Sequence, residues 1–245
     1  GCAVDSSLSL INEHTFHIEP GGVSAQLDVE RLTGRLGARW VDERGWEWGA
    51  QLSAHLYSGG LLDRPLNAYH DLIGLDRIVG EPGQAAVTVA GQGRTVSYQG
   101  AALALGTPEV SVGRAFGNLW LKAQLGTGLG SRAYFTNVGA WRAALSAGVE
   151  QARWGVAAQV TAPLIAGDLA HLGVRPSAAV SGWAQLSPPL RVSVEARTSP
   201  FAQAGFFSRP VVSLQLAWRG VTFQEDLRAP LPDVAFGVAA SWRCR

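Results

Sequence analysis

Apolar residues alternate with small or polar residues at a period of two along most of the chain. In the segment 212–219, apolar side chains occupy the even positions, and the same holds from 234 to 243. Successive side chains of a β-strand point to opposite faces, so this pattern predicts strands with one apolar face. We expect about twelve strands: 7–18, 23–32, 46–57, 109–115, 119–126, 138–150, 154–164, 177–186, 190–198, 210–219, 221–228 and 233–243. The run 32–41 continues the second strand, and a slip of phase near Glu30 and Arg31 predicts a β-bulge there.

The connections between these strands alternate in length. The short ones are Asp42–Gly45, Phe116–Asn118, Gln151–Arg153, Ser187–Pro189 and Gly220, and the longer ones are 58–108, 127–137, 165–176, 199–209 and 229–232. Pro20–Gly22 is the exception among the longer set. Short turns on one side and longer loops on the other are typical of an outer-membrane β-barrel. The pattern predicts one domain over 1–245, an all-β closed antiparallel transmembrane barrel with both termini at the short-turn side.

Aromatic residues favour this barrel over a soluble β-sandwich. Tryptophans lie near strand ends at the short turns, and we expect an aromatic girdle there of Trp40, Trp46, Trp48, Trp154, Trp218 and Trp242, with Trp120 nearby. Tyr57, Tyr134, Phe16, Phe135, Phe201, Phe206 and Phe207 gather at the opposite ends. Two aromatic belts separated by an aliphatic band are typical of membrane-spanning barrels. The alternative is that the tryptophans fill the ends of a sandwich core, but such a core would not sort them by turn type.

Charged residues share the phase of the small polar residues. The set expected to line a lumen comprises Arg35, Arg39, Glu47, Lys122, Arg142, Arg191, Glu195, Arg197, Arg219, Asp226 and Arg228. In a soluble barrel these side chains would face water outside. In a membrane barrel they point inward, because charge on the lipid face costs about 2–4 kcal/mol at the bilayer midplane. We expect six of these charges, which lie on three successive strands, to form an ion-pair network, because same-face neighbours on adjacent strands lie about 5 Å apart: Arg191, Glu195, Arg197, Arg219, Asp226 and Arg228. We expect the lumen to be constricted and to have a weak preference for anions.

Composition narrows the functional classes. Only 16% of residues are charged, the formal net charge is +1, and the chain contains 30 glycines. Such a charge gives no field that would attract nucleic acid, and the glycines argue against a helix-rich protein. No two of the five histidines have metal-ligand spacing on one strand face, so we expect no metal site and no cofactor. No secretory signal heads the chain, and we expect a mature form.

The long segment 58–108 differs from the other connections. Asp63 can cap a short helix that begins near Pro65 and ends at Gly74. A hairpin of Ala86–Val89 with Thr95–Tyr98 is expected to follow. The segment is either a plug or lid over the lumen or an ordinary ordered surface loop.

Three motifs resemble one known family. They are SGGLLD at 58–63 followed by AYHDLIGL at 68–75, Trp46–Gly49 at a strand opening, and Glu225–Asp226 followed by PDVAF at 232–236. Together they resemble a Gram-negative family of uncharacterised outer-membrane-type β-barrel proteins. The resemblance implies a barrel in the bacterial outer membrane, and it implies no catalytic residue. The chain departs from many such barrels because it ends Trp242–Arg245 rather than on an aromatic residue.

Three functions are compatible with this barrel. The first is a narrow or plugged channel for small solutes, with the lipid bilayer of the outer membrane as its partner. The second is a structural or anchoring subunit that binds other envelope proteins. The third is a hydrolase, for which Ser58, His70 and Asp71 are the nearest candidates. Because His70 and Asp71 are adjacent in sequence, the aspartate is poorly placed to orient the ring, and we expect no enzymatic activity.

The two cysteines, Cys2 and Cys244, lie at opposite ends of the chain. The first and last strands of a closed barrel are neighbours, and neighbouring strands are about 4.8 Å apart, within the reach of a disulfide. An oxidising periplasm permits the bond. We therefore expect a Cys2–Cys244 disulfide, with lipid attachment at Cys2 and two free thiols as the alternatives.

Overall fold

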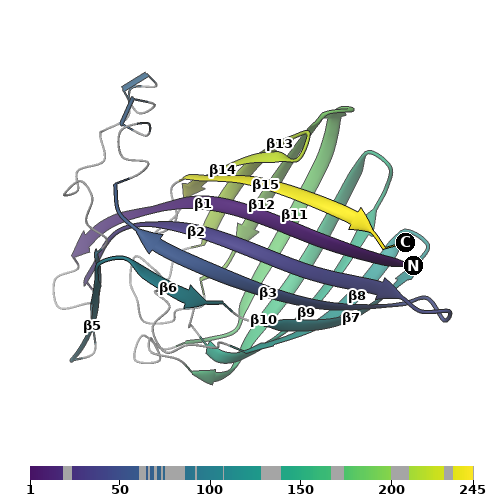
Figure 1. Ribbon diagram of the computed structural model, residues 1–245, viewed down its shortest axis with the longest axis horizontal. Helices are drawn as coiled ribbons and strands as arrows, with labels where there is room; N and C mark the ends of the chain where they lie inside the picture. The colour runs from purple at the N-terminus through teal and green to yellow at the C-terminus, as the bar shows by residue number, and fades with distance from the viewer. Residues whose placement is uncertain are drawn as a thin grey trace.

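The computed structural model describes the chain except for residues 19–23, 61–64, 66, 69–70, 73, 75–85, 92, 107, 128–138, 167–173, 200–209, 229–233 and 245. The described residues form one antiparallel sheet of 15 strands (Figure 1). Its long strands are Cys2–Ile18 (β1), Ser24–Val41 (β2), Trp46–Ser58 (β3), Glu109–Phe116 (β7), Leu119–Thr127 (β8), Gly139–Glu150 (β9), Trp154–Ala166 (β10), Ser177–Ser187 (β11), Leu190–Arg197 (β12), Val211–Trp218 (β13), Val221–Arg228 (β14) and Val234–Arg243 (β15). Three shorter strands are Ala86–Gly91 (β4), Arg94–Gln99 (β5) and Ala102–Leu105 (β6).

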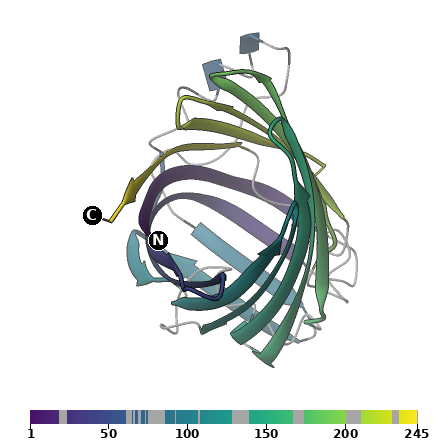
Figure 2. The same cartoon turned by 90° about the vertical axis from the view of Figure 1, so that its right-hand side faces the viewer.

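Twelve strands close into a ring, as the alternation predicts. β1 pairs with β15 on one side and with β2 on the other, and β2 pairs with β3. From β3 the ring continues through β7 to β15 in sequence order. Figure 2 shows the strands arranged around a common axis. Closure gives each of the twelve ring strands a hydrogen-bonded neighbour on both sides, whereas within the described residues the short strands β5 and β6 pair on one side only.

One end of the barrel, called here the tight-turn end, carries the short connections and both chain termini (Figure 1). The turn between β13 and β14 is the shortest kind, with Arg219 at φ 50° and Gly220 at φ 85°. Positive φ at both central residues is the geometry that matches the twist of a two-residue hairpin. These turns confirm the short connections expected from the sequence.

The described strands within 58–108 extend the barrel wall. β6 pairs with β3 beyond the point where β7 stops, and β4 pairs with β2 beyond the end of β3. β4 and β5 form the expected hairpin. Residues 65, 67, 68, 71 and 72 are helical, and Gly74 has φ 75°, which suits a residue that ends a helix. The helical residues lie outside the ring of strands in both views (Figures 1 and 2). Whether the remainder of 58–108 acts as a plug or lid stays a prediction.

Two details of the first strands differ from expectation. The first strand begins at Cys2 rather than at residue 7, because the serine-rich residues 5–9 hide its alternation. The bulge expected near Glu30 is wrong: β1 and β2 pair in continuous register from Cys2↔Trp40 to Ile18↔Ser24. The apparent slip arises because Asn12 and Glu30 oppose each other in the outward phase and are each 1% exposed. These two polar residues lie where the pairing partner of β2 changes from β3 to β4, and both are buried there.

The two faces of the wall have opposite chemistry. Among the described residues only Val29, Tyr57, Ala144 and Val211 are buried apolar residues, whereas large apolar side chains such as Leu36 (60% exposed) and Leu145 (68%) cover the outside. A soluble sandwich buries its large apolar side chains between two sheets. This chain instead presents them outward and turns most of the charged residues of its wall inward, together with serines and glycines.

Candidate functional site: the barrel lumen

A cavity of about 360 Å³ lies inside the barrel against β1, β2, β3, β7, β8 and β15. Six charged residues border it: Asp5, Arg35, Arg39, Glu47, Glu109 and Lys122. Four of them, Arg35, Arg39, Glu47 and Lys122, belong to the set expected from the sequence. Asp5 was missed because the first strand was expected to begin later. Glu109 was not predicted to face the lumen. It alternates in sequence with the same residues as Ser111 and Gly113, so it shares their face of the strand, and this alternation could have identified it.

Several lumen charges interact across an intervening strand. Glu109 of β7 forms an ion pair with Arg142 of β9, and the residue between them on β8 is Gly126. A glycine leaves space above the strand for two long side chains to meet. The sequence predicts ion pairs on adjacent strands, so the pairing of Glu109 with Arg142 across β8 differs from that expectation. On adjacent strands, Arg39 lies 3.1 Å from Asp5.

Glu47 and Lys122 also lie either side of a glycine, because each opposes Gly113 of β7. In the described part of the chain, neither has an ion-pair partner within 4.0 Å. The carboxylate of Glu47 and the ammonium group of Lys122 therefore border the cavity without being paired to each other.

The opposite wall holds a second group of charges. Arg197 of β12 lies 3.6 Å from Glu195 on the same strand and 3.4 Å from Asp226 of β14. The Asp226 side chain is 1% exposed and also accepts a hydrogen bond from Gln224 Nε2 at 3.2 Å. Three members of the expected network are thus brought together.

The other three expected members lie elsewhere. Arg191 places its guanidinium 4.0 Å from the ring centre of Trp183. Arg219 lies in the β13–β14 turn, outside the lumen, with its guanidinium 5.2 Å from the Trp218 ring. A register shift between Val212 and Ser213 sets Arg228 opposite Val212, a position of the outward phase, and the Arg228 side chain is outside the described residues. Sequence alternation fails at Arg228 because a bulge changes the parity.

Two tryptophans belong to the inner face. Trp120 opposes Gly148, and Trp183 opposes Gly155, on strands β9 and β10. A Cβ atom at Gly148 would lie 2.6 Å from Trp120 Cζ2, so the indole occupies the space that the glycine leaves. Trp120 lies near a short turn as expected, but it points inward. The lumen is thereby narrowed by two indoles toward the tight-turn end.

A buried polar cluster lies on β2 and β3. His55 Nδ1 is 2.9 Å from Thr33 Oγ1, and its Nε2 is 3.4 Å from Ser53 Oγ. Tyr57, expected among the outer aromatics, is 0% exposed and belongs to this buried region. Gly106 packs directly against Ser53 and His55, and its N–H donates to the Ser53 carbonyl at 2.8 Å. Of the earlier hydrolase candidates, Ser58 ends β3, Asp71 is helical and exposed, and His70 is outside the described residues.

The six expected girdle tryptophans all lie on the outer surface. Their exposed fractions range from 38% for Trp46 to 55% for Trp242. The Trp40 and Trp48 rings stack with centroids 6.5 Å apart. The aromatics expected at the opposite ends are mostly outside the described residues, although Trp141 of β9 is 40% exposed there.

The turn 42–45 is organised by Asp42. Its Oδ1 accepts hydrogen bonds from the backbone N–H groups of Trp46 (2.9 Å) and Arg44 (2.8 Å), and its Oδ2 accepts one from the Trp48 indole (3.4 Å). The Trp46 hydrogen bond is the main reason that the pKa of the Asp42 carboxyl lies below its usual range.

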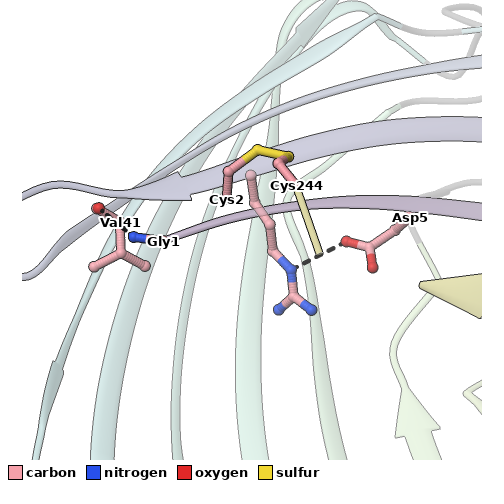
Figure 3. Close-up of a disulfide and its surroundings, with 6 residues drawn as sticks. Gly1, Cys2, Asp5, Val41 and Cys244 are labelled. Carbon is pink, nitrogen blue, oxygen red and sulfur yellow. Dashed lines mark hydrogen bonds and ion pairs between the residues drawn. A yellow bond between two sulfur atoms is a disulfide. The ribbon is translucent and has the colours of Figure 1, made fainter. Parts of the chain in front are cut away.

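A disulfide between Cys2 and Cys244 joins the first and last strands, as expected (Figure 3). The two Cα atoms are 5.2 Å apart, and Cys244 N–H donates to the Cys2 carbonyl at 3.1 Å. On the other side of β1, Val41 N–H donates to the Gly1 carbonyl at 2.7 Å. β1 is thus tied to both neighbours at the tight-turn end.

No group of three or more His, Cys, Asp or Glu side chains within the described ranges is arranged to hold a metal ion. Among those residues, no helix has the length and apolarity to cross a membrane.

No protein-family model matches the chain, and no curated protein matches it. The resemblance to an uncharacterised barrel family therefore stays a hypothesis. Solved structures with some likeness include a mutant of the porin of Rhodopseudomonas blastica, with 11% identity and a TM-score of 0.42. Another mutant of that porin has 13% identity and a TM-score of 0.33. In both comparisons 99% of each chain is covered. Likeness at this level carries no argument about what this chain does, and the barrel is established by its own strand pairing.

Proposed function

We propose that this barrel spans the outer membrane of a Gram-negative bacterium and forms a narrow channel for small solutes. The observation that carries the proposal is the reversed chemistry of the wall, apolar outside and charged inside. Tryptophans at the tight-turn end of the outer face suit the interface between lipid and water. A cell with two membranes has an oxidising periplasm at one side of such a barrel, which suits the disulfide.

The lumen supports a narrow pathway rather than a wide pore. Twelve strands lie between the filled eight-stranded barrels and the open porins of 16–18 strands. Trp120, Trp183 and the paired charges occupy part of the interior, and the cavity of about 360 Å³ holds only a small solute. Arginines and Lys122 slightly outnumber the acids that face inward, so we expect a weak preference for anions.

Conductance in a planar lipid bilayer tests the proposal. We expect small single-channel steps, and a reversal potential in a salt gradient that indicates weak anion preference. Lys122→Glu should shift that potential toward cations, and Glu47→Gln should shift it toward anions. Arg153→Gln, in the exposed turn between β9 and β10, is the matched control and should leave it unchanged. A bilayer that stays sealed by the inserted, folded barrel would contradict the channel.

The sealed outcome would favour the alternative of a structural subunit bound to other envelope proteins. A hydrolase is not proposed. Among the described residues the structure brings Ser53 and His55 together, and the backbone at Gly106 packs directly against both. A substrate carbonyl has no room to reach Ser53 Oγ in that arrangement.

A further inference from the structure

Arg114 is a cation on the apolar outer face of the barrel. It lies on β7 between Trp46 of β3 and Leu121 of β8, which oppose it in the two ladders. Both neighbours face outward, with Trp46 38% exposed and Leu121 48% exposed. Arg114 shares their phase, so its side chain leaves the wall on the side that would face lipid.

Arg114 lies close to the tight-turn end of the barrel wall. Arg114 precedes the last residue of β7, Phe116, by two positions, and it opposes the first residue of β3. At about 3.4 Å per residue, it lies within about 7 Å of the strand end. A cation on the lipid face costs about 2–4 kcal/mol at the midplane and only about 0–1 kcal/mol near the interface. In the membrane location proposed above, this position corresponds to the level of the lipid headgroups.

Two aromatic rings hold the guanidinium. Arg114 Cζ is 5.3 Å from the ring centre of Trp46 and 5.4 Å from that of Phe116, both within cation–π range. Among the described residues no carboxylate forms an ion pair with it. Ring contacts use the faces of a guanidinium and leave its N–H edges available. Those edges match the oxygens of a phosphate in two parallel hydrogen bonds.

We propose that Arg114, held by Trp46 and Phe116, binds the phosphate of a lipid headgroup in the leaflet at the tight-turn end. The proposal rests on the membrane location proposed above. The headgroup supplies the negative charge that this cation lacks, while the acyl chains cover the apolar side chains beside it. Arg219 over Trp218 is a related but simpler contact, since it has one ring and lies in the turn, beyond the strand.

Lipid binding by the folded full-length barrel in non-ionic detergent tests this site. The probe is dioctanoyl phosphatidylglycerol, and bound copies are counted by native mass spectrometry. Arg114→Gln should weaken the tightest binding step by about tenfold, the loss expected for charge-assisted hydrogen bonds. Arg114→Lys should retain part of the affinity, and Arg219→Gln should change it little.

Two further ligands separate the possible sources of affinity. Dioctanoylglycerol, which lacks the phosphate, should bind the wild-type barrel no better than it binds the Arg114→Gln variant. Inorganic phosphate should displace the lipid only weakly, and displacement at equal concentration would overturn the lipid assignment. Unchanged phosphatidylglycerol affinity in Arg114→Gln would also overturn it.

Folding and insertion are measured separately, by circular dichroism and by flotation with vesicles. If the wild-type chain floats with vesicles but Arg114→Gln binds lipid as well as the wild type does, the headgroup site is rejected and the membrane location is kept. A wild-type chain that does not associate with vesicles would reject the membrane location itself.

Discussion

The guanidinium of Arg197 on β12 lies 3.4 Å from the carboxylate of Asp226 on β14, although β13 runs between the two strands. Ser213 of β13, a small residue opposite Asp226, leaves the space in which they meet. The Asp226 side chain is 1% exposed, so its charge depends on the cation and on Gln224.

Replacing Arg197 with glutamine should therefore destabilise the barrel. The change leaves a buried carboxylate without its cation, and we expect the free energy of unfolding to fall by about 1–3 kcal/mol. Urea titration of the protein in lipid vesicles, followed by tryptophan fluorescence, measures the effect.

The double variant Arg197→Gln with Asp226→Asn is the control for this pair. Removing both charges avoids the unpaired carboxylate, so the double variant should be more stable than Arg197→Gln alone. The single variant Asp226→Asn completes the cycle. If the losses of unfolding free energy in Arg197→Gln and Asp226→Asn simply add in the double variant, the two residues do not interact and the assignment of a lumen ion pair is wrong.

A second prediction concerns the packing of Trp120 against Gly148. A Cβ atom at Gly148 would lie 2.6 Å from Trp120 Cζ2 and 2.7 Å from the Val156 carbonyl oxygen. Because the carbonyl belongs to the backbone and cannot easily move, Gly148→Ala should cost about 1–3 kcal/mol of stability. It should also displace the indole and change its fluorescence.

Gly34→Ala is the matched control, since no atom lies within 4 Å of a Cβ at Gly34. It should leave the stability almost unchanged. Equal stability of the two alanine variants would show that the inner wall at Gly148 is not filled by Trp120.

Much of this architecture follows from the sequence. Alternation specified the twelve wall strands and the hairpin of β4 and β5, because each strand separates an apolar face from a polar face. It also gave the short turns, and with them the position of the disulfide. Failures occur where alternation is weak or broken. Residues 5–9 read as polar, and Arg228 follows a register shift that reverses its parity.

The contents of the lumen were harder to predict. Period two tells which side chains point inward, but it does not tell how far along the axis each one lies. Trp183 is an example, because its contact with Arg191 depends on the register of β11 against β12. The glycines opposite Trp120 and Trp183 were a usable signal, since an inward glycine marks space for a large neighbour.

The turn at Asp42 should respond to acid. Hydrogen bonds, first from the Trp46 N–H, lower the pKa of this carboxyl below its ordinary value of 3.8. A carboxyl with a lowered folded-state pKa contributes its full stabilisation above 3.8 and loses it as the pH falls through the lower value. The protection factor of the Trp46 amide against hydrogen exchange should therefore fall only in that acidic range.

Asp42→Asn should remove this pH dependence, because asparagine does not titrate there. Proton titration of the Asp42 carboxyl by nuclear magnetic resonance gives the direct measurement. A folded-state pKa at or above 3.8 would show that the hydrogen bonds of this turn do not favour the charged form.

The disulfide gives the last prediction. Cys2 and Cys244 close a loop of nearly the whole chain, for which the loop-entropy model assigns about 5 kcal/mol as an upper figure. Reduction, or the Cys2→Ser and Cys244→Ser double variant, should lower the stability by at most that amount. The β1–β15 seam should also lose protection first, since the Cys244 N–H to Cys2 carbonyl hydrogen bond lies beside the bridge. Hydrogen exchange along residues 2–12 and 234–243 measures this, with β10 and β11 as the internal reference. A seam that exchanges no faster than β10 after reduction would mean that strand pairing alone holds the barrel closed. Intact mass checks the chemistry: the bridged chain gains two hydrogens on reduction, whereas two thiols that titrate in the unreduced, unfolded protein would rule the bridge out.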